Sequence, residues 1–245
     1  MKRLVLTLVV LAGFAARGSP ALEQQTVTHA GKAFLVFRID PLADDLRLFW
    51  KGADGKPLST LAALEKHLDD SGGELLWAMN AGMYHGNLDP VGLHLENGRL
   101  LRPLNLDRGE GNFFWKPNGV FLVTPRGGSV VEATSSLKIP ADTRLATQSG
   151  PMLVIKGRIH PGFRPDSTSR LTRNGVGIRS PRDVRFVMTD RLVNLHEFAA
   201  FFRDGLGCRD ALYLDGTISS LYTRSPRRSD FRMALGPMIG LVADR

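Results

Sequence analysis

A short apolar run near the C-terminal end of the chain leads directly into a carboxylate. Residues 211–214 (Ala-Leu-Tyr-Leu) are typical of a buried strand, and Asp215 and Gly216 follow at once. A strand that ends in an acid holds it on a rigid element, which is a common way to present a catalytic or ligand-binding carboxylate. The ordinary alternative is an Asp-Gly turn between two strands. Asp215 is therefore the first candidate for acid–base chemistry.

Arginines and hydroxyl side chains alternate in residues 160–175. Arg170 and Arg173 lie close to Ser169 in this run. A guanidinium group can bind two phosphate oxygens at once, and hydroxyls and backbone amides complete such sites. A solvated basic loop would need no ligand, but the density of hydroxyls between the arginines favours a site for an anionic group.

Three further polar segments interrupt the hydrophobic pattern. They are Asn-Ala-Gly at 80–82, an aromatic and amide-rich stretch at 109–119, and Gln-Ser-Gly at 148–150. Amide side chains bond sugar hydroxyls, and aromatic rings stack on sugar faces. Turns, or a strand that alternates between core and surface, would explain the same residues without a ligand. The binding candidates from these segments are Asn80, Gly82, Asn118, Gln148, Ser149 and Gly150.

Motifs for metal binding and nucleophilic catalysis are weaker. His85, Asn87 and Asp89 could offer ligands to a cation, but their spacing matches neither an EF-hand loop nor a zincin, so a polar loop is the better interpretation. Ser149 lacks the Gly-x-Ser-x-Gly context of a nucleophilic serine. Cys208 is the only cysteine, and its position after a predicted helix fits a small buried residue better than a reactive thiol.

The elements that must position these side chains are mostly short strands. Asn97-Gly98 predicts a tight hairpin turn, because both residues tolerate positive φ. The strands are expected at 33–39, 45–50, 74–79, 91–95, 99–101, 119–124, 129–133, 152–155, 158–160, 183–189, 210–214 and 237–242.

Two helices are expected beside these strands. One covers residues 59–70 with Ser59 as its N-cap, and the other begins after Asn194, which forms a capping-box pattern with Glu197. Strands outnumber helices and no regular βαβ rhythm appears. The sequence therefore predicts an α+β fold, a single domain built on a mixed, mainly antiparallel sheet with a few helices.

Residues 1–21 have the pattern of a secretory signal peptide. A short basic region precedes an apolar run at 4–16, and Ser19 and Ala21 occupy the small-residue positions of a cleavage site. The run is shorter than the roughly 20 apolar residues of a membrane span. An uncleaved anchor is the alternative. We expect residues 22–245 to form a periplasmic or secreted domain with no stable membrane insertion after cleavage.

The charge of the chain carries less information than its pI of about 10.1 suggests. Removing Lys2, Arg3 and Arg17 with the signal peptide lowers the formal charge from +8 to +5. The remaining basic residues form no long tract of the kind that binds nucleic acid. Together with the expected export, this pattern predicts a small acidic substrate and no nucleic-acid partner.

Several of the polar segments match one family pattern when they are taken in order. The matching stretches are 80–83 (Asn-Ala-Gly-Met), 117–119 (Pro-Asn-Gly), 148–153 (Gln-Ser-Gly-Pro-Met-Leu), Ser169-Arg170 with Arg173, 175–178 (Gly-Val-Gly-Ile) and 211–216 (Ala-Leu-Tyr-Leu-Asp-Gly). This set resembles the phosphodiester glycosidase family, which includes the catalytic domain of the lysosomal uncovering enzyme. The resemblance spans roughly residues 30–243. Many members have a second glycine after the Asp-Gly pair, and this chain has Thr217 there, so the approach of the backbone to a ligand is expected to differ.

The resemblance implies a hydrolase that cleaves the glycosyl–phosphate bond of a sugar-1-phosphodiester. It gathers Asn80, Gln148, Ser149, Asp215 and one or both arginines, Arg170 and Arg173, into one pocket, with Asn118, Gly216 and the other candidates around it. In that pocket the arginines would stabilise the departing phosphate, and Asp215 would activate water or face the glycosyl cation.

Other interpretations stay open at this level. Glu110 is a rival for a second acid. A divalent cation could bind Asp215 and the loop 85–89, although the sequence requires no cofactor. The chain could also be a non-catalytic module that binds anionic glycans, or a metal-dependent phosphodiesterase that cuts the P–O bond.

Overall fold

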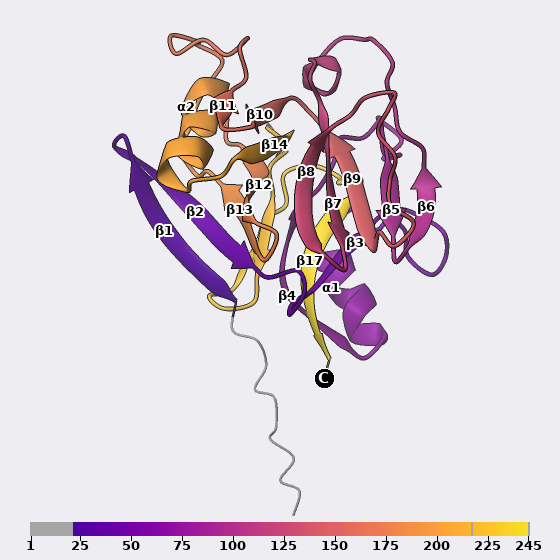
Figure 1. Cartoon of the computed structure of the whole chain (residues 1–245). Helices are drawn as coiled ribbons and strands as arrows, with labels where there is room; N and C mark the ends of the chain where they lie inside the picture. The colour runs from indigo at the N-terminus through magenta and orange to yellow at the C-terminus, as the bar shows by residue number, and fades with distance from the viewer. Residues whose placement is uncertain (1–21, 217, 245) are drawn as a thin grey trace, which may run out of the picture.

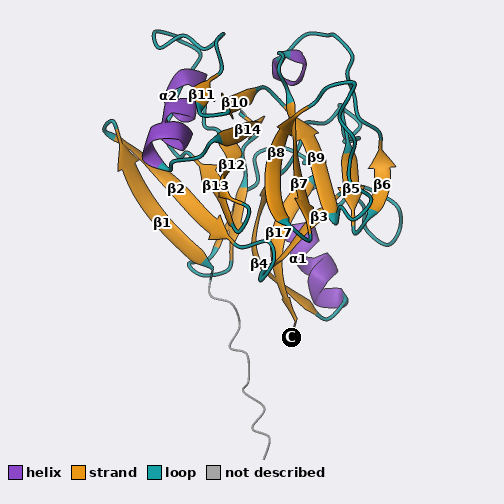
Figure 2. Ribbon diagram, in the orientation of Figure 1, coloured by secondary structure: helices purple, strands orange, loops and turns teal. Residues whose placement is uncertain are grey.

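The strands of the computed structural model form three separate antiparallel sheets (Figures 1 and 2). The structure describes residues 22–216 and 218–244, so the predicted signal peptide, residues 1–21, lies outside the described residues. Every strand pairing in the described part is antiparallel. The prediction of a mainly antiparallel single domain is confirmed. The single mixed sheet is replaced by three sheets, and the helical content is lower than an α+β fold suggests.

The largest sheet has seven strands in the order β1-β2-β13-β12-β14-β10-β11. It consists of β1 (Glu23–His29), β2 (Lys32–Ile39), β13 (Asp183–Met188), β12 (Asn174–Ser180), β14 (Asp210–Asp215), β10 (Met152–Ile155) and β11 (Arg158–Ile159).

The other two sheets have five strands each. The second sheet contains, in spatial order, β16 (Arg228–Ser229), β15 (Leu221–Thr223), β4 (Gly73–Asn80), β17 (Met238–Asp244) and β3 (Asp45–Phe49). The third contains β6 (Arg99–Arg102), β5 (His94–Glu96), β9 (Leu145–Ser149), β7 (Gly119–Thr124) and β8 (Gly127–Glu132).

One hydrophobic core joins the three sheets. The ring of Trp77 on β4 lies 5.4 Å from that of Phe37 on β2 and 5.0 Å from that of Phe186 on β13. Phe186 in turn contacts Phe121 of β7 at 5.6 Å between centroids. All four side chains are fully buried. Each of the three sheets therefore contributes one face to the same core.

The outer faces of the sheets are covered by the short helices and a loop. Helix α2 (Leu195–Ala200) continues into a π-helical turn (Phe201–Gly205) and packs on the seven-stranded sheet, as Figure 2 shows. Helix α1 (Leu61–Asp70) covers the second sheet. Leu137 and Ile139, from the segment after β8, pack on the third sheet.

The predicted cap of α2 and the predicted tight turn at Asn97-Gly98 are confirmed, whereas the predicted cap of α1 is wrong by one residue. Asn194 caps α2 with the predicted capping box, because its side chain accepts from the Glu197 N–H at 2.8 Å and Glu197 accepts from the Asn194 N–H at 3.0 Å. Asn97-Gly98 forms the predicted hairpin turn with positive φ at both residues. The N-cap of α1 is Thr60 rather than Ser59, because the Thr60 hydroxyl accepts from the Ala63 N–H.

Strand β12 was not predicted, because its glycines and polar residues hide the alternating pattern of a strand. A Cβ at Gly177 would lie 2.5 Å from Phe202 and 2.8 Å from the Cys208 sulfur, so the sheet accepts the helical aromatic rings only where this strand has no side chain. Cys208 is buried in that layer, and burial raises the pKa of its thiol to about 12, which agrees with the prediction of an unreactive cysteine. Among the described residues, no helix has the length and apolar character needed to cross a membrane.

Candidate active site

The sheet ends bring the predicted polar residues to one edge of the molecule. Asn80 ends β4, Ser149 ends β9, Asp215 ends β14 and Asn174 begins β12. Strands β9 and β14 end on the same upper side in Figure 1. Asn174 pairs with Asp215 across the sheet, and the Ser149 hydroxyl donates to the carbonyl of Leu214 at 3.0 Å. Segments that are far apart in the sequence therefore meet at the ends of these strands.

Two buried amide side chains, those of Asn80 and Asn174, bond to each other at these strand ends. The Asn174 side chain donates to the Asn80 carbonyl at 2.9 Å and to the Asn80 side-chain oxygen at 3.2 Å. The Ser220 N–H also donates to that oxygen at 3.0 Å, and Ser219 donates to the Asn174 side-chain oxygen at 3.4 Å. The amide of Asn80 is thus engaged with the turn that follows Asp215. A direct contact of Asn80 with a sugar stays a prediction.

Asp215 lies on the partly exposed end of β14, and burial raises the pKa of its carboxyl to about 6. The Gly216 N–H donates to it at 2.5 Å and opposes that rise. A carboxyl with this pKa can take up and release protons near neutral pH, as a general base or acid must.

Two tyrosines lie beside Asp215, and sequence reasoning selected neither. Burial raises the pKa of both Tyr84 and Tyr213, and the negative charge of Asp215 adds to the rise. The Tyr84 hydroxyl donates to the carbonyl of Ala234 at 2.7 Å. A Cβ at Gly216 would lie 2.3 Å from the Tyr213 hydroxyl, so this glycine lets the phenol approach the strand end. Tyr213 precedes Asp215 by two residues in its strand, which is the one sequence signal that could have selected it.

Arg173 is a buried cation whose protein partners are neutral. Its side chain is 1% exposed and donates to the carbonyls of Val193 (2.8 Å) and Ser169 (2.9 Å) and to the Tyr213 hydroxyl (2.9 Å). An ionised group so deep in the protein is expected to have a charged partner or ligand. The Tyr213 hydroxyl lies between the Arg173 guanidinium and Gly216, the residue that follows Asp215 at the end of β14.

A cavity of about 160 Å³ lies against the Arg173 side chain. Trp115 contributes one wall, packed edge-on against His160 and Phe163 at 5.3 Å and itself 39% exposed. The predicted aromatic stretch therefore forms a 3-10 turn (Asn112–Phe114) rather than a strand, and presents Trp115 beside the arginine. Further residues around the cavity are Asn112, Ser167, Ser169 and His196.

Arg170 has a different environment from Arg173. It is exposed and forms two hydrogen bonds with Glu197, at 2.8 and 3.0 Å. Glu197 also pairs with Lys32 at 3.3 Å and caps α2. The two predicted arginines are therefore separated, and only Arg173 is linked to the end of β14 by the contacts described above.

The candidates around β9 mainly hold the surrounding loops. The Gln148 side-chain oxygen accepts from the N–H groups of Leu93 (3.0 Å) and Asn105 (2.9 Å), and its amide donates to the Asn105 carbonyl (2.6 Å). A Cβ at Gly82 would lie 2.4 Å from the Gln148 carbonyl oxygen, so only glycine lets the chain after Asn80 pack against β9. A contact of Gln148 with sugar hydroxyls stays a prediction.

Asn118 and Gly150 form a second close contact. A Cβ at Gly150 would lie 2.6 Å from the Asn118 Cβ. The Asn118 amide donates to the Phe113 carbonyl at 2.9 Å, while its side-chain oxygen is buried without a hydrogen-bond partner. That oxygen is an acceptor still free for a bound group or a water molecule.

The polar loop after β4 has the structure of a turn. The Asn87 side-chain oxygen accepts from the Asp89 N–H at 3.1 Å, and Asp89 pairs with Arg102 at 2.8 Å. Within the described ranges, no group of three or more His, Cys, Asp or Glu side chains is arranged to hold a metal ion. Glu110, the rival acid, is exposed in the loop before the 3-10 turn.

Comparison with known proteins adds a family to this geometry. Residues 73–241 match the family model of phosphodiester glycosidases (NAGPA). The Escherichia coli (strain K12) protein YigE, described as uncharacterized, is 36% identical over 225 residues, which cover 91% of this chain and 86% of that protein.

Solved structures share the fold at low sequence identity. The catalytic domain of zebrafish N-acetylglucosamine-1-phosphodiester α-N-acetylglucosaminidase, auto-inhibited by its pro-peptide, has a TM-score of 0.65 at 16% identity, with 92% of this chain and 85% of that chain covered. A hypothetical protein from Synechocystis has a TM-score of 0.57 at 16% identity, with coverage of 91% and 61%. The family match covers most of the chain and includes both strand ends that carry Asn80 and Asp215. The chain therefore belongs to the phosphodiester glycosidase family of enzymes and is a hydrolase of sugar phosphodiesters.

Proposed function

We propose that the protein hydrolyses the bond between the anomeric carbon of a sugar and the oxygen of a phosphodiester, with Asp215 and Arg173 as its principal catalytic groups. The observations that carry this proposal are a desolvated carboxyl at the end of β14 and a buried guanidinium that forms no ion pair among the described residues. The guanidinium donates to the Tyr213 hydroxyl, which lies against Gly216 at the same strand end. The family assignment supports the substrate class, and the geometry supports separate roles for Asp215 and Arg173.

The leaving group explains why one acid is sufficient. An ordinary glycosidase must protonate an alcohol as it departs and uses a second carboxylic acid for that step. A phosphodiester departs as a phosphate monoester that is already a stable anion. The site then needs a cation where negative charge accumulates and a carboxylate near the sugar carbon.

Asp215 is assigned to the water and the sugar. As the water oxygen bonds to the anomeric carbon, the carbon–oxygen bond to phosphate breaks, and the phosphate retains the bridging oxygen and the bonding electrons. The proton from the water passes to Asp215 and then to solvent. A carboxyl pKa of about 6 leaves most of the group ionised at pH 7 and still basic enough to accept that proton.

Arg173 is assigned to the phosphate. Its guanidinium faces neutral partners and lines the cavity beside Trp115, so an incoming phosphate would supply the negative charge that the protein does not. The exposed face of Trp115 suits the apolar side of a sugar or of its aglycone. Arg170 is the second candidate for this role, held by Glu197 at the rim.

The position of bond cleavage tests the proposal directly. A panel of sugar-1-phosphodiesters is incubated with the enzyme in oxygen-18 water, with and without chelator, and the products are weighed by mass spectrometry. Label in the sugar supports the proposal. Label in the phosphate would instead show a phosphodiesterase that cuts the P–O bond, and binding without any product would indicate a glycan-binding module.

A matched variant ties the chemistry to the site. Asp210 begins β14 as Asp215 ends it, and accepts from the Lys156 N–H at 2.9 Å. Asp210→Asn should retain turnover, whereas Asp215→Asn should not. Equal activity of the two variants would show that the carboxylate at the strand end is not the catalytic group.

We also propose that the protein is exported and that residues 1–21 are removed. The basic start, the apolar run and the small residues before Leu22 support this proposal. Mass spectrometry of the protein recovered from a periplasmic or culture fraction should give an N-terminus at Leu22. Recovery of the full-length chain from the cytoplasm alone would contradict it.

A further inference from the structure

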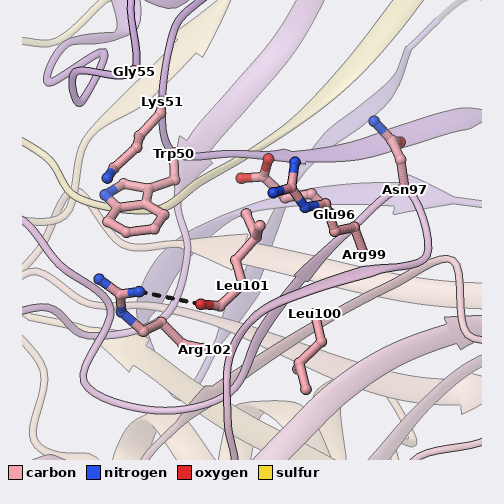
Figure 3. A pocket seen from close by; sticks show the side chains of 9 residues that line it. All are labelled: Trp50, Lys51, Gly55, Glu96, Asn97, Arg99, Leu100, Leu101 and Arg102. Carbon is pink, nitrogen blue, oxygen red and sulfur yellow. Dashed lines mark hydrogen bonds between the residues drawn. The ribbon is translucent and has the colours of Figure 1, made fainter.

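A hollow larger than the cavity beside Arg173 lies elsewhere on the molecule. It measures about 770 Å³ and lies between the loop that follows β3 and the β5–β6 hairpin (Figure 3). The family assignment and the mechanism proposed above leave it without a role. Its principal polar residues are Trp50, Lys51, Glu96, Arg99 and Arg102.

Two of the cations in this hollow have no acidic partner. Arg102 pairs with Asp89 at 2.8 Å, and Glu96 bonds the buried His94 ring at 2.7 Å. Neither Lys51 nor Arg99 forms an ion pair within residues 22–216 and 218–244, although Arg99 is the cross-strand partner of Glu96, whose carboxylate lines the same hollow (Figure 3). A concave surface with free cations concentrates the field on an anionic ligand.

Trp50 adds a third donor at the same place. Its side chain is 2% exposed, and its indole N–H is buried and has no hydrogen-bond partner among the residues that the structure describes. The Lys51 ammonium lies 4.1 Å from the ring centroid and the Arg102 guanidinium 4.8 Å from it. In Figure 3 the ammonium extends over the end of the ring that carries the nitrogen. Lys51 is exposed, and an ammonium group on a four-carbon stem can move aside, so that an entering ligand would meet both donors.

The strand register places this hollow near the active site. Met238 of β17 pairs with Asn80 on one side and with Phe49 on the other. Trp50 therefore leaves the sheet two strands from Asn80, a separation of about 10 Å at the usual strand spacing. A second hollow of about 360 Å³, lined by His85, Asp89 and Arg102, lies along the loop that follows Asn80 and shares Arg102 with the first.

We infer that the Trp50–Lys51–Arg99 hollow is a second phosphate-binding site, which holds a further phosphate group of an extended, multiply phosphorylated carbohydrate substrate. The inference rests on the proposed function for its kinetic part only. Its donors are an ammonium, two guanidinium groups and an indole N–H, which match a ligand made of acceptor oxygens. The volume leaves room for sugar or polyol atoms beside the phosphate.

Binding is tested without turnover by following the Trp50 indole N–H signal in the NMR spectrum. The chain has three tryptophans, and Trp50→Phe identifies the signal. Inorganic pyrophosphate is titrated into the protein, with sodium chloride at matched ionic strength as the reference. The Trp50 signal should shift and saturate, and the double variant Lys51→Ala/Arg99→Ala should raise the Kd about tenfold or more, the loss expected for one or two charge-assisted contacts.

A second double variant serves as the control. Lys138→Ala/Arg158→Ala removes the same formal charge from exposed positions outside the hollow. It should bind pyrophosphate as the wild type does. A Trp50 signal that does not move, or a Kd equally weakened in both double variants, would overturn the inference.

The kinetic measurement compares two substrates of the wild-type enzyme. One is a sugar-1-phosphodiester with a single phosphate, and the other carries a second phosphate on its aglycone. Lys51→Ala/Arg99→Ala should raise KM about tenfold for the second substrate and leave the first unchanged. Equal KM changes for both would contradict an extended substrate. If the wild type cleaves neither, the proposed function fails, while the NMR titration still decides whether the hollow binds phosphate.

Discussion

Replacing Asp215 with asparagine should lower kcat about a thousandfold and stabilise the fold. Burial raises the pKa of this carboxyl from 3.8 to about 6, so the folded protein holds an ionised group that the unfolded chain would solvate better. A shift of roughly two pKa units corresponds to about 3 kcal/mol at pH 7.5, where the group is ionised in both states. Asparagine has a similar shape, keeps an oxygen for the Gly216 N–H and carries no charge. The variant should therefore be more stable by up to about 3 kcal/mol, and that full difference would raise Tm by about 6–12 °C for a chain of this size.

The pH dependence of this effect follows from the direction of the shift. Because the pKa of Asp215 is raised on folding, its favourable contribution to stability is present below pH 4 and is lost as the pH rises through about 6. The Tm advantage of Asp215→Asn should thus be full at pH 7.5 and small at pH 4. Thermal unfolding at the two pH values, with Asp210→Asn as the matched control, measures it.

The pH dependence of activity should report the ionisation of the same carboxyl group, that of Asp215. Wild-type kcat/KM should rise with pH along a single-proton curve with its midpoint near 6, because the ionised form of Asp215 is the base. Asp215→Asn should lower kcat by about a thousandfold, within the range for loss of a general base. An asparagine variant that is less stable than the wild type at pH 7.5, or that retains turnover, would refute the assignment of a desolvated catalytic carboxylate.

Three other substitutions test the surroundings of this group. Arg173→Ala should lower kcat/KM by about a hundredfold or more, measured at a temperature where circular dichroism shows that the variant is folded. Arg170→Ala should lower kcat/KM by less than about tenfold. It should also lower the free energy of unfolding by at most about 1 kcal/mol, because it breaks only an exposed pair with Glu197. Similar losses in the two variants would show that the buried guanidinium has no special role. Tyr213→Phe removes the hydroxyl that accepts from Arg173 and should reduce kcat about tenfold with a small change in Tm; unchanged kinetics would remove Tyr213 from the site. Gly82→Ala places a Cβ 2.4 Å from a β9 carbonyl oxygen and should destabilise the fold by about 2–4 kcal/mol in urea unfolding; wild-type stability would contradict the close packing described.

The parts of the fold that sequence predicts are those set by neighbouring residues. The capping box at Asn194 and Glu197 and the turn at Asn97-Gly98 depend on a few adjacent backbone groups, so their residue types are sufficient. Strand β12 depends on distant rings. The strand has glycines where the rings of Phe198 and Phe202 occupy the space that a side chain would need. The local sequence pattern gives no sign of this contact between glycine and ring. The division into three sheets depends likewise on a core shared by residues from the whole chain.

In the candidate site too, the sequence does not reveal contacts between residues that are distant along the chain. Residue type selected an acid at a strand end and a cation suited to phosphate. The structure places the Tyr213 hydroxyl, which accepts from Arg173, against Gly216 at the same strand end, and the catalytic roles of Asp215 and Arg173 stay predictions. Residue type could not show that the amides of Gln148 and Asn80 would bond to the protein. A buried amide must satisfy its own hydrogen bonds before it can serve a ligand, and which partner it meets is decided by loops that are distant in sequence.

In the proposed mechanism, Asp215 can act as a base because no guanidinium among the described residues forms a hydrogen bond with it, and Arg173 donates to Tyr213 instead. A guanidinium in direct contact with Asp215 would lower the pKa of the carboxyl and weaken it as a proton acceptor. Tyr213 instead accepts from Arg173, and its own pKa responds to both charges: Arg173 lowers it, and Asp215 raises it. The cation thus remains free to meet an incoming phosphate, while the carboxylate keeps the high pKa that burial gives it. A substrate phosphate that neutralises Arg173 would isolate Asp215 further, so the apparent pKa in the pH profile of kcat should lie at or above that of kcat/KM. The opposite order would show that the carboxylate meets the guanidinium directly once substrate is bound.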